Sequence, residues 1–118
     1  MKISFDIDGT LDNRTIIDFY WWFYMMKSKL SHLGLFIITN RLDVPEQYKN
    51  IVNDKTNVYL LGVLDNAYTK LDILLKEEIN IHFDDNEFEV AQINNYAKEH
   101  NLNLTAVLVN YNGKVDDN

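Results

Sequence analysis

The sequence predicts a single α/β domain in which a mainly parallel, five-stranded sheet lies between two layers of helices. Short β-rich segments alternate with longer helical segments along the chain, and the strand candidates are continuously apolar instead of alternating between apolar and polar. The chain has 118 residues, enough for one hydrophobic core, and it shows no internal repeat or linker. We therefore expect one domain covering residues 1–118.

The five strand candidates are short apolar runs that end at polar or turn-forming residues. The first, residues 3–7 (ISFDI), ends at an Asp-Gly turn signal, and the second, residues 35–39 (LFIIT), is apolar throughout until its final threonine. The other three are residues 57–63 (NVYLLGV), 79–83 (INIHF) and 104–109 (LTAVLV). Runs of this kind are typical of parallel strands that are buried on both faces.

Helical segments separate the strand candidates. The first covers about residues 18–32 and ends before Gly34, a good stop signal, and the second lies near residues 45–53, with Pro45 in its first turn. Residues 68–77 and 88–100 form two more, and a short polar tail occupies residues 112–118. The inward positions expected for the last two helices are Leu71, Leu74, Leu75, Val90, Ile93, Tyr96 and Ala97.

Composition narrows the classes of function. The net charge of -7 and the pI of about 4.7 argue against charge-driven binding to nucleic acid or to an anionic membrane. The absence of cysteine excludes a disulfide, a thiolate metal site and a cysteine nucleophile. Two acids among the first eight residues argue against a signal peptide, and no apolar run is long enough to span a bilayer. We expect a cytoplasmic protein with no membrane partner.

Two carboxylates follow the first strand, at the edge of a parallel sheet where ligands bind. Side chains alternate along a strand, so Asp6 and Asp8 point the same way while Ile7 enters the core. Their mutual repulsion is commonly relieved by a divalent cation, and Gly9 permits a tight turn away from the sheet. The alternative interpretation of this segment alone is an ordinary Asp-rich junction between a strand and a turn.

Polar residues also follow the second and fourth strands. Thr39 and Asn40 offer a hydroxyl and backbone N–H groups for phosphate oxygens, although Thr-Asn is also common in turns. Asp84 and Asp85 follow the fourth strand, where they suit either a cation or the N-terminus of the next helix. Lys70, at the start of a helix, would by itself be interpreted as a solvated lysine.

Together, the order of acid pair, threonine, lysine and acid pair resembles the haloacid dehalogenase superfamily. FDIDGTL matches its first motif, IITNR its second, Lys70 the lysine of its third and HFDDN its fourth. The resemblance extends from residue 3 to about residue 109. It implies a Rossmann-like α/β/α sandwich, and the connections between strands are too short for the cap domain that many members carry. The chain therefore looks like a small capless member.

The resemblance also implies a reaction, the hydrolysis of a phosphomonoester through an aspartyl-phosphate. Asp6 would attack phosphorus, and Asp8 would protonate the leaving group and then activate water. Thr39 and Lys70 would grip the phosphate oxygens. Because Asp8 and Thr10 are both present, the chain looks like a phosphatase and not a dehalogenase.

The resemblance further implies a cofactor, Mg²⁺, held by hard oxygen ligands. These would be the side chain of Asp6, the backbone carbonyl of Asp8, and Asp84 and Asp85. Which member of the Asp84–Asp85 pair touches the metal directly stays open. The residues implied for substrate binding are Gly9, Thr10, Thr39, Asn40 and Lys70.

The substrate class and the oligomeric state stay open. Candidate substrates are a nucleotide, a sugar phosphate or a polynucleotide end; the alternatives are a phosphoprotein, or a non-catalytic binding module that retains the site. The apolar segment that begins at Phe19 and ends at Met26 either packs on the sheet with partly exposed tyrosines or forms a homo-oligomer contact. Arg14 and Arg41 either bind a second anionic group at the mouth of the site or are surface arginines, and we interpret His82 as structural.

Overall fold

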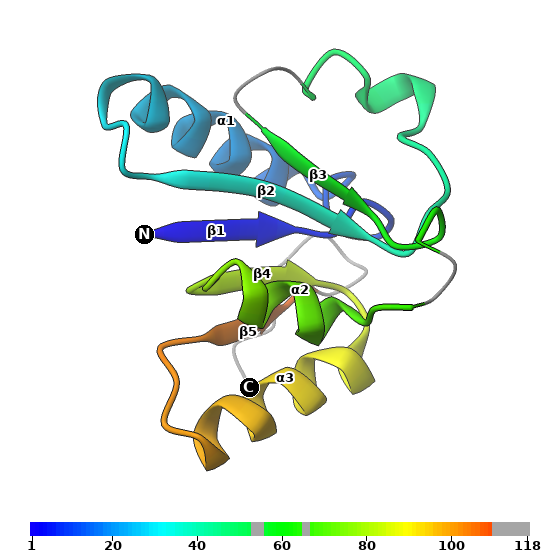
Figure 1. Ribbon diagram of the computed structural model, residues 1–118. Coiled ribbons are helices and arrows are strands. Elements are labelled where there is room, and N and C mark those ends of the chain that lie inside the picture. Colours follow the sequence, from blue (N-terminus) through cyan, green and yellow to red (C-terminus); the bar gives the residue numbers. More distant parts are fainter. Residues whose placement is uncertain (53–55, 65–66, 110–118) are drawn as a thin grey trace.

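A five-stranded sheet with every neighbouring pair parallel forms the centre of the computed structural model, which describes residues 1–52, 56–64 and 67–109 (Figure 1). The strand order is β3-β2-β1-β4-β5, which confirms the predicted α/β class and the five-stranded parallel sheet. The strands are β1 (Lys2–Phe5), β2 (Gly34–Thr39), β3 (Asn57–Leu60), β4 (Ile81–Asp84) and β5 (Thr105–Leu108).

The sheet has a topological switch point at its centre. The chain runs from β1 outward through β2 to β3, then returns to β4 on the other side of β1 and continues to β5. The connections that leave β1 and β4 therefore diverge to opposite sides, and the gap between them at the carboxyl edge is where such sheets bind ligands. Asp6 follows β1 at this point, and its N–H donates to the carbonyl of Phe83 in β4 at 3.0 Å.

Helices cover both faces of the sheet (Figure 1). On one face, α1 (Arg14–Lys29) buries Ile16, Tyr20 and Phe23 in a core that includes Phe5. On the other face, α2 (Lys70–Lys76) and α3 (Glu87–Glu99) bury a second core. Its helical members are Ile73, Leu74, Val90, Ile93 and Ala97.

Side-chain caps explain where two of the helices begin. Helix α1 begins at Arg14, earlier than predicted, because the side chain of Asn13 accepts a hydrogen bond from the N–H of Ile16. Helix α2 begins at Lys70, where Thr69 and Asp72 form a reciprocal capping box. The capping box therefore places Lys70 in the first turn of α2.

Two segments differ from the predicted elements. The predicted helix near residues 45–53 is reduced to one 3₁₀ turn, η1 (Glu46–Tyr48). After this turn, the carbonyl of Ile51 accepts a hydrogen bond from the hydroxyl of Tyr20 at 2.7 Å. Strand β3 ends at Leu60, earlier than predicted, because the N–H of Gly62 turns back to the carbonyl of Arg41 at 3.2 Å. Residue 53 and the predicted polar tail, residues 112–118, lie outside the described residues.

The aromatic segment of α1 is divided between the core and the surface. Tyr20 and Phe23 are buried, while Trp22 and Met25 are 57% and 61% exposed. One face of the helix therefore packs on the sheet, and whether the exposed face associates with a second copy stays a prediction. In the described parts of the chain, no helix combines the length and apolar character needed to cross a membrane.

Candidate phosphate and cation site

Six of the predicted site residues line one cleft of about 280 Å³ at the carboxyl edge of the sheet. The cleft lies at the switch point, where β1, β2 and β4 end. A larger cleft of about 520 Å³ lies at the opposite, amino edge beside Lys2 and Asn80, and its described lining holds a single acid, Glu78. The smaller cleft brings the predicted site residues together. Its predicted members are Asp6, Asp8, Thr39, Asn40, Lys70 and Asp85, joined by Arg41, Asn86 and Glu89.

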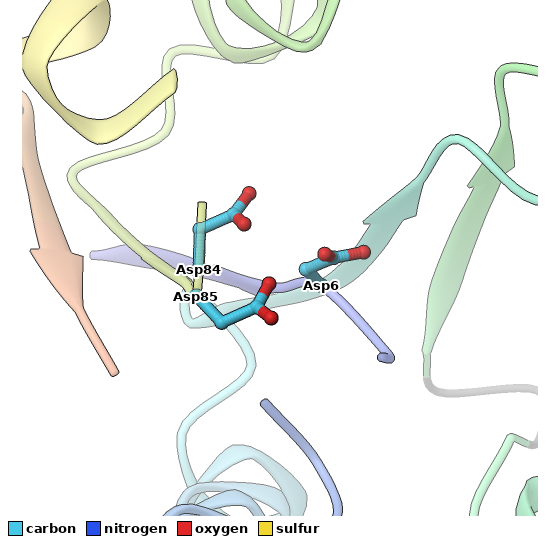
Figure 2. Close-up of side chains that lie close together, drawn as sticks. All are labelled: Asp6, Asp84 and Asp85. Atoms are coloured by element: carbon cyan, nitrogen blue, oxygen red, sulfur yellow. The ribbon is translucent and has the colours of Figure 1, made fainter. Parts of the chain in front are cut away.

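Three carboxylates converge beside this cleft. Asp6, Asp84 and Asp85 each offer one oxygen, and these three oxygens lie within 4.8 Å of one another (Figure 2). Asp6 and Asp84 are buried and Asp85 is exposed. Three carboxylate oxygens at this spacing, with one side open to water, match the ligands that Mg²⁺ or Ca²⁺ prefers. The donor set therefore fits a hard divalent cation.

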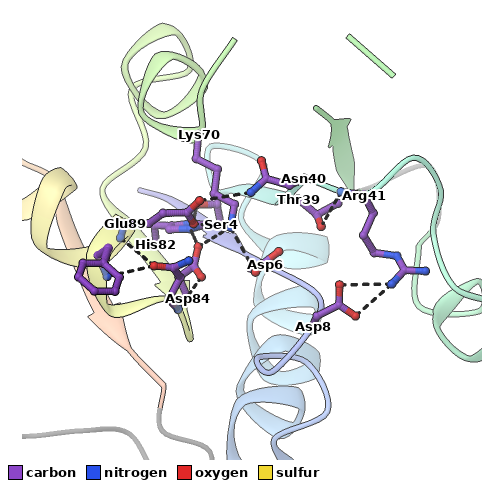
Figure 3. Close-up of polar contacts among 12 residues, drawn as sticks. Ser4, Asp6, Asp8, Thr39, Asn40, Arg41, Lys70, His82, Asp84 and Glu89 are labelled. Carbon is purple, nitrogen blue, oxygen red and sulfur yellow. Dashed lines mark hydrogen bonds and ion pairs between the residues drawn. The ribbon is translucent and has the colours of Figure 1, made fainter. Parts of the chain in front are cut away.

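Lys70 is the cationic centre of the site (Figure 3). Its Nζ lies 2.7 Å from Asp84 Oδ2, 2.7 Å from Glu89 Oε2 and 3.2 Å from Asp6 Oδ2. Burial would lower the pKa of Lys70, but the charges of Asp6 and Asp84 and the hydrogen bonds to Asp84 and Glu89 outweigh it, so the pKa is raised above its usual value. Lys70 therefore stays protonated.

Burial and charge separate the pKa values of Asp6 and Asp84. The pKa of Asp6 is raised to about 7. Burial is the largest cause, Lys70 opposes the rise, and the negative charge of Asp84 adds to it. Burial would also raise the pKa of Asp84, but His82 and Lys70 hold it well below its usual range. Such separation of neighbouring acids is common in catalytic sites. Asp84 is therefore the fixed anion, and Asp6 is the acid that exchanges its proton near neutral pH.

Asp8 lies at the mouth of the cleft and faces Arg41, outside the cluster of three acids (Figure 3). Arg41 Nη1 donates to both carboxylate oxygens of Asp8, at 3.1 and 3.3 Å, and Arg41 Nε donates to the carbonyl of Asp43. The side chain of Asp8 is 65% exposed. The structure thus places Arg41, one of the two arginines suggested for the mouth, in direct contact with Asp8. Arg14 does not line the cleft.

Gly9 has a steric role, and Thr10 faces away from the cleft. Gly9 has a φ of +72°, and a Cβ there would collide with the carboxylate of Asp85. Thr10 is fully buried, and within the described residues its Oγ1 has no hydrogen-bond partner. Neither residue lines the cleft, so their predicted contact with substrate stays a prediction.

Thr39 and Asn40 lie on the other wall. Thr39 is buried, and its Oγ1 accepts a hydrogen bond from the N–H of Arg41 at 3.4 Å. Asn40 Nδ2 donates to Glu89 Oε1 at 3.2 Å, which connects the end of β2 to the first turn of α3. A hydroxyl, an amide and a buried ammonium therefore surround the cleft next to the acids.

Sequence reasoning missed Glu89, and it interpreted His82 as structural without predicting the contact of His82 with Asp84. In the sequence, Glu89 is one of several acids at the start of a helix. In the structure it lies in the first turn of α3, which Asn86 caps, and its Oε2 accepts a hydrogen bond from Lys70. His82 Nε2 lies 2.9 Å from Asp84 Oδ2. The alternation of side-chain direction along a strand signals this contact, because His82 and Asp84 are two positions apart in β4 and share one face.

The fold and the site together define an α/β protein with an acidic cluster and a buried lysine at the switch point of its sheet. No protein-family model, no curated protein and no solved structure matches this chain. Its function is therefore inferred from the geometry of the site itself.

Proposed function

We propose that this chain is a Mg²⁺-dependent phosphomonoesterase of the haloacid dehalogenase type, with the three-layer α/β/α fold of that superfamily and no cap domain. The observation that carries the proposal is the convergence of Asp6, Asp84 and Asp85 within 4.8 Å, beside the buried ammonium of Lys70, in one open cleft. This arrangement suits phosphoryl transfer, in which catalysis depends on positioning and on neutralising negative charge.

The reaction would proceed in two steps. In the first, a carboxylate oxygen of Asp6 forms a bond to phosphorus, the ester P–O bond breaks, and the leaving oxygen takes a proton from Asp8. In the second, Asp8 removes a proton from water, the water oxygen bonds to phosphorus, and inorganic phosphate leaves Asp6. The exposure of Asp8 at the cleft mouth suits a group that meets both the leaving group and water.

Mg²⁺ would be held by Asp6, Asp84 and Asp85, and when bound it supplies positive charge against the phosphate oxygens. Lys70, next to Asp6 and Asp84, supplies further positive charge, and Thr39 and Asn40 offer a hydroxyl and an amide to the same oxygens. Four carboxylates and two cationic side chains line the cleft, and the buried carboxylate of Asp84 lies beside it, so a dianionic phosphate needs the positive charge of the metal to bind. The two cationic side chains are Lys70 and Arg41.

Arg41 and the overall charge bear on the substrate. The guanidinium next to Asp8 lies on the side where the leaving group would be protonated, so it suits a substrate with a second anionic group. The net charge of -7 favours small phosphorylated metabolites or nucleotides over long nucleic acids. We therefore expect the substrate to be a sugar phosphate, a nucleotide or a short polynucleotide end.

Hydrolysis of an aryl phosphate tests the proposed function. We expect release of the aryl alcohol in the presence of millimolar Mg²⁺, and a loss of about 100-fold or more when EDTA is added, because the carboxylates then repel the phosphate. Restoring Mg²⁺ in excess should restore the rate. Turnover that continues unchanged in EDTA, or no turnover of any member of a panel of phosphomonoesters, would contradict the proposal.

The binding of Mg²⁺ should depend on pH because the pKa of Asp6 is raised to about 7. Below pH 7 the cation must displace a proton from Asp6, so apparent affinity should fall about tenfold per pH unit between about pH 7 and 5 and level off above about pH 8. Calorimetry in two buffers of different ionisation enthalpy should show release of about one proton at pH 6. The Asp6→Asn variant should lose this pH dependence. If the Mg²⁺ affinity of the unaltered protein does not change between pH 5 and 7, Asp6 is not the proton-linked ligand.

A further inference from the structure

Two buried polar residues that the proposed reaction does not use form a chain that ends at Asp84 (Figure 3). Ser4 Oγ lies 2.7 Å from His82 Nδ1, and His82 Nε2 lies 2.9 Å from Asp84 Oδ2. All three residues have no exposed surface. Ser4 and His82 are direct partners across β1 and β4, so the register of the two central strands sets their contact.

The chemistry of the groups sets the direction of these hydrogen bonds. An ionised carboxylate only accepts, so His82 Nε2 must carry the hydrogen that points at Asp84. The hydroxyl of Ser4 forms a hydrogen bond with the other ring nitrogen, Nδ1. Hydrogen bonds at both nitrogens therefore fix the orientation of the imidazole.

The hydrogen bonds to Asp84 leave room for a cation on one of its oxygens only. Oδ2 accepts from both His82 Nε2 and Lys70 Nζ, which uses its two lone pairs. Oδ1 accepts one hydrogen bond, from the N–H of Asn86 at 3.1 Å, and keeps one lone pair. Asp84 therefore presents Oδ1 to a cation and Oδ2 to Lys70.

Folding alone does not explain a polar pair at this position. In the same row of the sheet, the partner of Ser4 in β2 is Phe36 and the partner of His82 in β5 is Ala106, and both are buried and apolar. Burying polar groups costs desolvation, and apolar residues of similar volume commonly serve a fold as well or better. The hydrogen bonds of this polar pair lead to the carboxylate of Asp84.

We propose that Ser4 and His82 are positioning residues that hold Asp84 with Oδ1 toward the divalent cation and Oδ2 toward Lys70. This inference rests on the proposed cation site. Without the N–H of His82, Oδ2 of Asp84 is held only by the ammonium of Lys70, which also binds Asp6 and Glu89, so the direction of the carboxylate is less well fixed for the cation.

Calorimetric titration with MgCl₂ at pH 8 tests the proposal on the full chain. We expect His82→Leu to weaken Mg²⁺ binding by about 10-fold or more, as is typical when the group that orients a ligand is removed. His82→Gln keeps an N–H near the position of Nε2 and should stay within about threefold of the unaltered protein. Ser4→Ala, a smaller change that keeps the imidazole, should weaken binding by an intermediate factor.

The controls separate positioning from loss of structure. Ile79→Val shortens a buried side chain of the same core at the amino end of the sheet, so it should lower the melting temperature and leave Mg²⁺ binding unchanged. If His82→Leu fails to fold, Ser4→Ala and His82→Gln still decide. Equal Mg²⁺ affinity in Ser4→Ala and the unaltered protein, or weakening in His82→Gln as large as in His82→Leu, would overturn the proposal.

Turnover provides a second reading. At saturating Mg²⁺, Ser4→Ala should lower kcat for an aryl phosphate with little change in KM, because Asp84 does not contact the substrate. If the unaltered protein binds Mg²⁺ but hydrolyses no phosphomonoester, the proposed activity fails while the positioning of the cation ligand stands. If it binds no Mg²⁺ at millimolar concentration, both proposals fail.

Discussion

Asp6→Asn should lower the hydrolysis of an aryl phosphate by about 10³-fold or more, the largest effect we expect from any single substitution. An amide keeps the shape of the carboxylate but is not a nucleophile, so no phosphorylated intermediate forms. The measurement is the initial rate at saturating Mg²⁺ and pH 8. Asp18→Asn replaces an exposed acid on α1 and should leave the rate unchanged.

The same substitution should not destabilise the protein. The pKa of Asp6 is about 7 in the folded protein and near 3.8 in the unfolded chain, so the folded state binds more protons between these values and stability falls as pH rises from about 4 to 7. Above pH 7 an ionised Asp6 opposes folding, and the asparagine removes this cost. We therefore expect urea unfolding at pH 8 to show Asp6→Asn at least as stable as the unaltered protein. If Asp6→Asn hydrolyses the aryl phosphate at a rate near that of the unaltered protein, Asp6 is not the nucleophile. If Asp6→Asn is much less stable, its loss of activity does not test the mechanism.

The positions of the acids could be predicted because they depend on strand ends. Asp6, Thr39 and Asp84 each lie at or next to the end of a parallel strand, and parallel strands end at one edge of the sheet. No knowledge of side-chain rotamers is needed to bring them together. The order of the motifs predicts Lys70 as a site residue, and the capping box of Thr69 and Asp72 is the local reason that α2 begins at Lys70.

The contacts that could not be predicted depend on register and on the rotation of helices. Ser4 and His82 are 78 positions apart and meet only because of the exact pairing of β1 with β4, which no local pattern encodes. Glu89 reaches Lys70 because α3 is rotated to bury Val90 and Ile93 on the sheet. The prediction of a helix near residues 45–53 was wrong beyond one 3₁₀ turn within the described residues, and the carbonyl of Ile51 accepts a tertiary hydrogen bond from Tyr20 that no local pattern signals.

Lys70→Met should destabilise the protein by about 3–5 kcal/mol at pH 8 without Mg²⁺, as is usual when one partner of a buried ion pair is removed. Methionine matches the length of lysine, so the change mainly removes charge. Asp6, Asp84 and Glu89 then face one another without a cation between them. Urea unfolding measures the loss, and Lys76→Met, an exposed lysine on the same helix, should cost far less.

Magnesium should restore stability to Lys70→Met but not activity. The uncompensated acids attract the cation more strongly, and a ligand that binds only the folded state stabilises it by an amount that grows with affinity. On addition of about 10 mM Mg²⁺, the gain in unfolding free energy of Lys70→Met should therefore exceed the gain in the unaltered protein. Turnover should stay about 100-fold or more below normal, because a phosphate oxygen still lacks the ammonium. Equal gains in the two proteins would mean that Lys70 and the cation do not share the same carboxylates, whereas recovery of turnover would mean that Lys70 serves the fold and not the phosphate.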